Sequence, residues 1–147
     1  MSYVQTYYHI VFSTKNRVPV LHQDKRKELY GYLWGILKNK DCHLYQLGGT
    51  EDHIHMLTSM HSTVCLAVLV RDLKTSSTSW IRKEQVFHSF PGWQGEYGAF
   101  TKSHSHRDGV IEYIRKQVDH HKTESFADEL RRLLREERID FEERHLL

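Results

Sequence analysis

The segment 48–60 restricts the fold more than any other part of the chain. Two glycines and an acidic pair, within 48–52, interrupt the pattern of residues 42–47, and polar and apolar residues then alternate over 53–60. This pattern predicts a turn at the glycines that joins two neighbouring strands into a hairpin. Because successive side chains of a strand point to opposite faces, His53 and His55 share one face. Ile54 and Met56 share the other face, which we expect to be the buried one.

Strand and helix patterns follow one another along the rest of the chain in a definite order. β-branched and aromatic residues favour strands, whereas apolar residues spaced three and four apart favour helices. Strands are expected over 3–14, 42–47, 53–60 and 93–100, and helices over 24–40 and 64–85. This order predicts a ferredoxin-like α+β fold, a four-stranded antiparallel sheet with helices on one face. Extra C-terminal helices are expected over 107–122 and 126–138.

Composition narrows the class of protein. A length of 147 residues with 39% hydrophobic content predicts a single folded domain, 1–147, and excludes a disordered chain. A net charge of +2 is too small to indicate nucleic-acid binding by itself. Cys42 and Cys65 are too few and too far apart for a cysteine-rich zinc site. Without a long apolar run or a signal pattern, we expect a cytoplasmic protein that does not enter a membrane.

The histidine pair of segment 48–60 is a candidate half-site for a metal. His53 and His55 lie one pleat repeat apart, roughly 6.5–7 Å between Cα atoms, so both imidazoles can reach a single divalent ion. With 12 histidines in the chain, however, one such pair is expected by chance. A second pair, His104 and His106, stands among polar and basic residues and is interpreted as a solvated loop. The spacing alone therefore leaves the metal site open, and a third ligand is needed.

Two motifs together resemble a known family. Segment 48–57, Gly-Gly-Thr-Glu-Asp-His-Ile-His-Met-Leu, resembles the His-hydrophobic-His motif of the HUH superfamily. Segment 113–117, Tyr-Ile-Arg-Lys-Gln, resembles the Tyr-x-x-x-Gln motif of its single-tyrosine transposases. These enzymes belong to small insertion sequences and include relatives associated with repetitive palindromic elements. Segments 8–15 and 92–97 are also similar to that family, so the resemblance extends over most of the chain.

The resemblance implies an activity and a set of site residues. The activity is that of a metal-dependent transposase, which cleaves and rejoins single-stranded DNA at hairpin-containing ends through a 5′-phosphotyrosine intermediate. Tyr113 would be the nucleophile, and His53, His55 and Gln117 would hold Mg²⁺ or Mn²⁺. The family also implies a homodimer, in which the tyrosine of one subunit can complete the site of the other. A phenol is a weak nucleophile at neutral pH, which fits the need for a metal or a neighbouring cation.

Further residues have less specific roles. Basic residues near the ends of the predicted elements are candidate phosphate contacts, each weak evidence alone: Lys15, Arg17, Lys102, Arg115 and Lys116. His9 and His43 are interpreted as packing on strand faces, and Glu51 and Asp52 as shaping the turn. His120 and His121 are expected at the surface, with an auxiliary ligand or phosphate contact as the alternative.

Two other functions fit parts of the sequence. The first is a catalytically silent or domesticated protein of the same fold that binds DNA hairpins without cleaving them. The complete set of His53, His55, Tyr113 and Gln117 argues against it. The second is a metal sensor that uses the clustered histidines, but it leaves the Tyr-x-x-x-Gln motif without a purpose.

Overall fold

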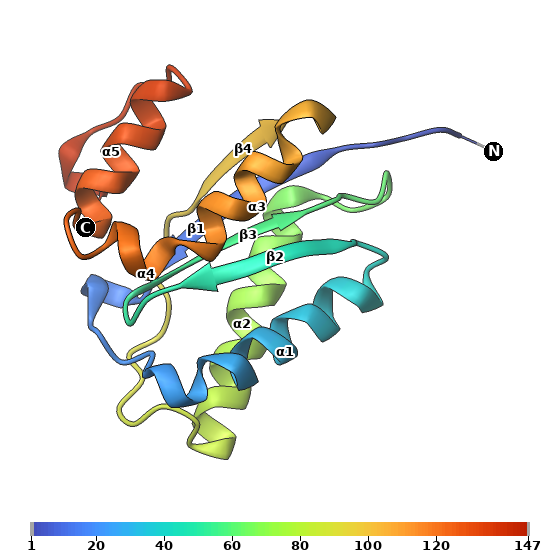
Figure 1. Cartoon of the computed structure of the whole chain (residues 1–147). Coiled ribbons are helices and arrows are strands. Elements are labelled where there is room, and N and C mark those ends of the chain that lie inside the picture. The colour runs from blue at the N-terminus through green and yellow to red at the C-terminus, as the bar shows by residue number, and fades with distance from the viewer. Residues whose placement is uncertain (1, 147) are drawn as a thin grey trace.

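The computed structural model describes residues 2–146 and contains the predicted sheet. Its strands are β1 (Tyr7–Ser13), β2 (Leu44–Gly49), β3 (His53–Thr58) and β4 (Gly98–Lys102), and its longer helices are α1 (Gln23–Asn39), α2 (Leu66–Glu84), α3 (Arg107–Arg115) and α5 (Phe126–Glu136). A short helix, α4 (Gln117–His120), follows α3. The strands lie in the order β2-β3-β1-β4 with every pair antiparallel (Figure 1). The predicted ferredoxin-like arrangement is confirmed.

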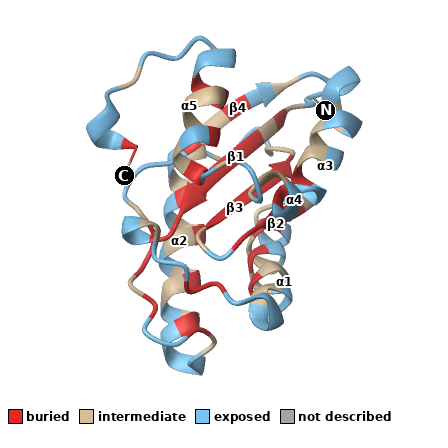
Figure 2. Ribbon diagram, turned by 60° about the vertical axis from the view of Figure 1, so that its left-hand side comes forward, coloured by how far each residue is buried: buried red, intermediate tan, exposed pale blue. Residues whose placement is uncertain are grey.

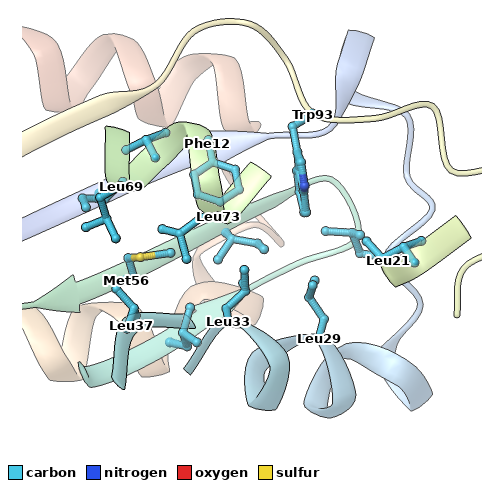
Figure 3. Packing of buried hydrophobic residues seen from close by; sticks show 14 of the residues in the cluster. Phe12, Leu21, Leu29, Leu33, Leu37, Met56, Leu69, Leu73 and Trp93 are labelled. Carbon is cyan, nitrogen blue, oxygen red and sulfur yellow. The ribbon is translucent and has the colours of Figure 1, made fainter. Parts of the chain in front are cut away.

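Helices α1 and α2 cover one face of the sheet and form the main core with it. Leucines spaced four apart on α1 point at the sheet, and leucines of α2 meet them from the side (Figure 3). The labelled members are Leu29, Leu33 and Leu37 from α1, Leu69 and Leu73 from α2, Phe12 and Met56 from the sheet, and Leu21 and Trp93 from the connecting segments. Each fully buried side chain of this size stabilises the fold by about 1.5–3 kcal/mol. This face holds α1 and α2 firmly against β1 and β3.

The C-terminal helices α3, α4 and α5 cover the other face. Val11 and Phe100 pack against α5, and Tyr7 and Leu57 pack against Ile114 of α3. As a result, all six residues of β3 are buried (Figure 2). Our expectation that the face of Ile54 and Met56 alone would be buried was therefore wrong. The strand alternation showed which side chains share a face, but it could not show that later helices would cover the second one.

The two glycines before the histidine motif lie in a strand rather than in a turn, contrary to prediction. Gly48 and Gly49 end β2, and residues 50–52 make the connection to β3. A Cβ atom on Gly48 would lie 2.4 Å from the backbone oxygen of Ile114. The missing side chain therefore lets α3 approach the sheet closely, which brings the end of α3 to the histidine strand.

Other predicted boundaries shift where packing overrides local pattern. The strand expected over 93–100 starts at Gly98, because Trp93 turns inward, bridges Thr14 and donates its indole N–H to Ser77 at 2.9 Å. Helix 64–85 is continuous over Leu66–Glu84, as predicted. The helix expected over 107–122 is interrupted at Lys116, where φ is −94° and ψ is 16°. None of the helices in residues 2–146 is long and apolar enough to span a membrane.

Candidate active site and metal centre

A cluster of histidine and carboxylate side chains lies between β3 and the C-terminal helices. The ligand atoms of His53, His55, His121 and Glu129 all lie within 4.8 Å of one another. Strand β3 supplies the first two residues, the turn after α4 supplies His121, and α5 supplies Glu129. The Nε2 atoms of His53, His55 and His121 lie 3.4, 2.8 and 3.0 Å, respectively, from the same carboxylate oxygen, Oε1 of Glu129. The chain thus gathers three imidazoles around one buried carboxylate.

Glu129 also connects the histidines to the tyrosine motif. Its second oxygen, Oε2, accepts hydrogen bonds from the Gln117 amide at 3.0 Å and from the Tyr113 hydroxyl. The Gln117 carbonyl in turn lies 2.9 Å from Nε2 of His53. Burial would raise the pKa of the Glu129 carboxyl, but its hydrogen bonds from His121, His53 and His55 outweigh burial and hold that pKa well below its usual range. Glu129 is therefore an anion at the centre of the site.

The two histidines of the motif have opposite protonation behaviour because their outer partners differ. Nδ1 of His53 lies 2.6 Å from the Asp52 carboxylate, whereas Nδ1 of His55 lies 2.8 Å from Nε2 of His9. Burial disfavours a charged imidazole at both positions. At His53 the hydrogen bonds to Asp52 and Glu129 outweigh burial and raise the pKa to about 9. At His55 burial prevails and lowers the pKa to about 4, so this imidazole stays neutral.

Tyr113 is held at the edge of the cluster by two charged groups of α5. Its hydroxyl donates to Glu129 and accepts a hydrogen bond from Nη2 of Arg132 at 2.7 Å. Arg132 is itself fixed by Glu124 at 2.9 and 3.1 Å. Burial and the Glu129 charge raise the pKa of Tyr113, and the opposing effect of Arg132 is smaller. The phenol is therefore protonated at neutral pH, and it donates its hydrogen bond to the Glu129 carboxylate.

The cluster fits a divalent cation. Three imidazole nitrogens converge on one carboxylate oxygen, which has only two lone pairs for hydrogen bonds. A cation coordinated by neutral imidazoles, the carboxylate and the Gln117 carbonyl would resolve this crowding, and its binding would release protons. Imidazole donors suit Zn²⁺, Cu²⁺, Fe²⁺ and Ni²⁺, whereas carboxylate and carbonyl oxygens suit Mg²⁺ and Mn²⁺, so this mixed donor set specifies a divalent cation without selecting one metal. The outer contacts of Asp52 and His9 would orient the two imidazoles of the motif, as is usual at metal sites.

The structure places the expected residues in two groups. His53, His55, Tyr113 and Gln117 meet at the cluster. The five basic residues are not among the cluster residues, and four of them are engaged with other groups. Lys102 pairs with Glu137 at 2.6 Å, Arg115 and Lys116 pair with Glu112 at 3.2 and 3.6 Å, Arg17 donates to the Leu146 carbonyl at 3.0 Å, and Lys15 lies in the short helix Lys15–Arg17.

Several residues of the site were missed or assigned too weak a role. Glu129 lies in the helix expected over 126–138 and was not singled out as a site residue, yet its side chain is fully buried. A signal for it exists in the sequence, because Phe126, Glu129 and Leu133 fall on one helical stripe that is otherwise apolar. His121 was expected at the surface and lies in the cluster instead. His9 packs on its strand face as predicted, and it also contacts His55.

Comparison with known proteins assigns the chain to a family. The sequence profile of IS200-like transposases matches residues 2–117, which include β1 to β4 and both sequence motifs. No curated protein matches the chain. Among solved structures, a candidate transposase from Deinococcus radiodurans R1 is similar with a TM-score of 0.62 and 23% identity, over 80% of this chain and 95% of that one.

A second solved structure has the same fold. It is a REP-associated tyrosine transposase bound to a REP hairpin, with a TM-score of 0.63 and 12% identity, over 82% of this chain and 72% of that one. At such low identities the two structures support the fold alone, whereas the profile covers most of the sequence. The chain therefore belongs to the IS200-like transposase family, as its two motifs predicted.

Proposed function

We propose that this transposase cleaves and rejoins single-stranded DNA with Tyr113 as its nucleophile and a divalent metal at the histidine cluster. The observation that supports this most strongly is the shared carboxylate. Glu129 accepts the Tyr113 hydroxyl on one oxygen and lies within reach of three histidines on the other. The proposed nucleophile and the proposed metal ligands of one chain are thus adjacent, with Gln117 between them.

The chemistry follows from these contacts. The Tyr113 oxygen attacks the phosphorus of a phosphodiester, oriented by its hydrogen bond to Glu129, and its proton is released to water because the lowered pKa of Glu129 makes that carboxylate a weak base. The bond between phosphorus and the 3′-oxygen breaks, and that oxygen takes up a proton from water, which leaves a 5′-phosphotyrosine and a free 3′-hydroxyl. A 3′-hydroxyl can attack this ester in the reverse direction, so strands are rejoined without ATP. A bound divalent ion supplies polarisation of the phosphate and offsets its developing charge.

Arg132 assists the nucleophile in this scheme. Its guanidinium lies 2.7 Å from the Tyr113 oxygen, where it stabilises negative charge as the phenol loses its proton. The pair with Glu124 fixes its direction. Since burial and Glu129 raise the pKa of Tyr113 in the resting protein, this cation is the group that favours the phenolate as the phosphate arrives.

An adduct assay with Tyr113→Phe tests the assignment. Protein is mixed with single-stranded oligonucleotides that carry hairpins from its genomic flanks, with Mn²⁺ or with EDTA, and is separated on a denaturing gel. We expect a metal-dependent shifted band in the parent, mapped to Tyr113 by mass spectrometry, and no band in Tyr113→Phe. Tyr3→Phe, at a residue that is 94% exposed, is the matched control and should form the adduct. A surviving adduct in Tyr113→Phe would refute the role of Tyr113.

The alternative function, hairpin binding without cleavage, is an outcome of the same assay. The REP-associated relative was solved with a hairpin bound, so hairpin DNA is the partner we propose for this chain too. Tight hairpin binding by the parent, without any adduct on DNA from several flanks, would support a silent binding protein.

The contacts also support the use of Tyr113 within its own subunit. Homodimerisation remains a prediction, but Tyr113 already meets the cluster of its own chain. Mixing Tyr113→Phe with the double variant His53→Ala, His55→Ala decides between the two arrangements. If the tyrosine acts within its subunit, neither protein forms an adduct, alone or mixed. Recovery of the adduct in the mixture would show that the tyrosine acts on the partner's site.

A further inference from the structure

A basic groove leads from the candidate active site to α1. It has a volume of about 350 Å³ and crosses the free edge of β2. On one side it is lined by Arg26, Lys27 and Tyr30 of α1, and on the other by Arg115 and Gln117. Gln117 also contacts His53 at 2.9 Å, so the inner end of the groove reaches the cluster. No acidic side chain lines the groove among the residues that the structure describes.

The flank of α1 that borders the groove continues with an exposed aromatic residue. Lys27, Trp34 and Lys38 are seven and four residues apart, so they lie along one side of the helix. The opposite side carries Tyr32, which stacks on Trp80 of α2 with ring centroids 4.5 Å apart. The flank of Trp34 therefore faces away from α2. Trp34 is 50% exposed, an unusual state for so large an aromatic ring.

Two cations of this flank, Arg26 and Lys27, have no ionic partner within residues 2–146, whereas Lys38 contacts the Trp34 ring. Within residues 2–146, Arg26 and Lys27 form none of the salt bridges of the structure, and the Lys38 ammonium lies 5.1 Å from the Trp34 ring centroid. A Cβ atom on Gly31, one turn before Trp34, would meet no atom within 4 Å, so the surface beside the indole is open. From Lys27 to Lys38 the helix rises about 16 Å, at about 1.5 Å per residue.

We propose that this groove and the α1 flank form the path of single-stranded DNA to the candidate active site. The proposal rests on the proposed function and adds to it the direction from which the strand arrives. Cations spaced along a surface bind successive phosphates, and an exposed indole stacks on a base of any sequence. A duplex keeps its bases stacked inside and cannot use Trp34 in this way. In a dimer with a twofold axis, the same basic surface of two copies would face itself. The repulsion between their positive charges disfavours a second copy as the occupant.

Binding of a fluorescein-labelled oligothymidine, which forms no hairpin, tests the path by anisotropy. Trp34→Ala should weaken binding about 5- to 150-fold, the range for loss of one stacked base, whereas Trp34→Phe should restore most of the affinity. Arg26→Gln with Lys27→Gln should reduce the slope of log affinity against log salt by about 1.4, since each phosphate contact to a single strand contributes about 0.7. Quenching of tryptophan fluorescence by the oligonucleotide should disappear in Trp34→Phe, because Trp93 is buried and Trp80 is stacked.

Matched controls remove the same charge and a similar ring elsewhere. Lys83→Gln with Arg144→Gln removes two exposed cations, and Tyr3→Ala removes an exposed aromatic ring. Neither should change oligothymidine binding by more than about twofold, within the usual range for surface substitutions. Equal losses in the controls would refute a defined path, as would a parent protein that does not bind oligothymidine.

The remaining outcomes separate the path from the proposed function. Unchanged binding in the α1 variants, with a normal Tyr113 adduct in the parent, would overturn the path and leave the function standing. Binding that depends on Trp34 in a parent without any adduct would support the path and count against the function. Sedimentation gives the last distinction. A dimer that Trp34→Ala converts to a monomer, with DNA binding unchanged, would show that the flank is a contact between two copies.

Discussion

Replacement of Glu129 by alanine should destabilise the metal-free protein more than any surface substitution. The side chain is fully buried and accepts hydrogen bonds from His55, His121, Gln117 and Tyr113, with a longer contact of 3.4 Å to His53, which keeps Asp52 and Gln117 as partners. In the Glu129→Ala variant these donors lose their acceptor while they remain packed between β3 and α5.

The magnitude can be worked from how many donors stay buried. Tyr113 is half-buried and the side chain of His121 is 10% exposed, so both of these donors can reach water instead. His55 and Gln117 are 0% and 1% exposed and have no such substitute for the lost bond. At about 1–3 kcal/mol for each unsatisfied group, and with the loss of a buried charge partner, we expect a decrease of about 3–5 kcal/mol in the free energy of unfolding.

Urea unfolding in EDTA, followed by circular dichroism, measures this difference. Glu136→Ala on the same helix is the control, since its pair with Arg132 is at the surface and should contribute less than about 0.5 kcal/mol. Should Glu129→Ala unfold completely, Glu129→Gln keeps the shape and should lose about 1–3 kcal/mol. Saturating Mn²⁺, at about 100 times its dissociation constant, should raise the free energy of unfolding of the parent by about 2.7 kcal/mol and that of either variant by much less. A loss below about 1 kcal/mol in Glu129→Ala would refute the central role of the carboxylate.

Two more outcomes follow from the structure. In EDTA, stability should be greatest near pH 6.5, the usual pKa of histidine. His53 has its pKa raised to about 9, so its contribution is complete below pH 6.5 and is lost as the pH rises through 9, whereas His55, with a pKa lowered to about 4, loses its contribution as the pH falls from 6.5 to 4. His53→Gln should flatten the alkaline side of the urea profile, and an unchanged profile would contradict this assignment. Gly48→Ala should lower the midpoint of thermal unfolding, because its Cβ would overlap the Ile114 carbonyl, whereas Gly35→Ala, in open space on α1, should raise it; equal shifts would refute the close approach of α3.

The fold could be predicted from the sequence because the patterns that specify its strands and helices lie within short segments. Alternation with a period of two and stripes with a helical period occur in an order that few sheets accommodate. Errors arose where a residue serves a distant contact. Gly48 was interpreted as a turn residue, but its missing side chain makes room for Ile114. Trp93 was assigned to a strand by its residue type, but it fills the space beside Phe12 at a ring distance of 4.9 Å.

The candidate site was predictable to the extent that its residues stand in short motifs. His53, His55, Tyr113 and Gln117 were selected by spacing and resemblance, and the structure brings them together. Glu129 stands 74 positions after His55, in a helix whose other acidic residues face solvent. Its role depends on how the chain returns to the sheet after α4, which no local pattern specifies. The family profile also ends before it, at residue 117.

Glu129, which lies outside both motifs, changes the explanation of how the two motifs are coupled. A spacing of four residues suggests that Tyr113 and Gln117 act together because they stand on one turn of a helix, but the helix is interrupted at Lys116. Glu129 joins them instead, because its Oε2 atom accepts a hydrogen bond from each of the two side chains. The position of the tyrosine relative to the histidines is thus set by α5, an element outside both motifs. A chain that keeps the two motifs and loses this helix would keep the residues of the site without their arrangement.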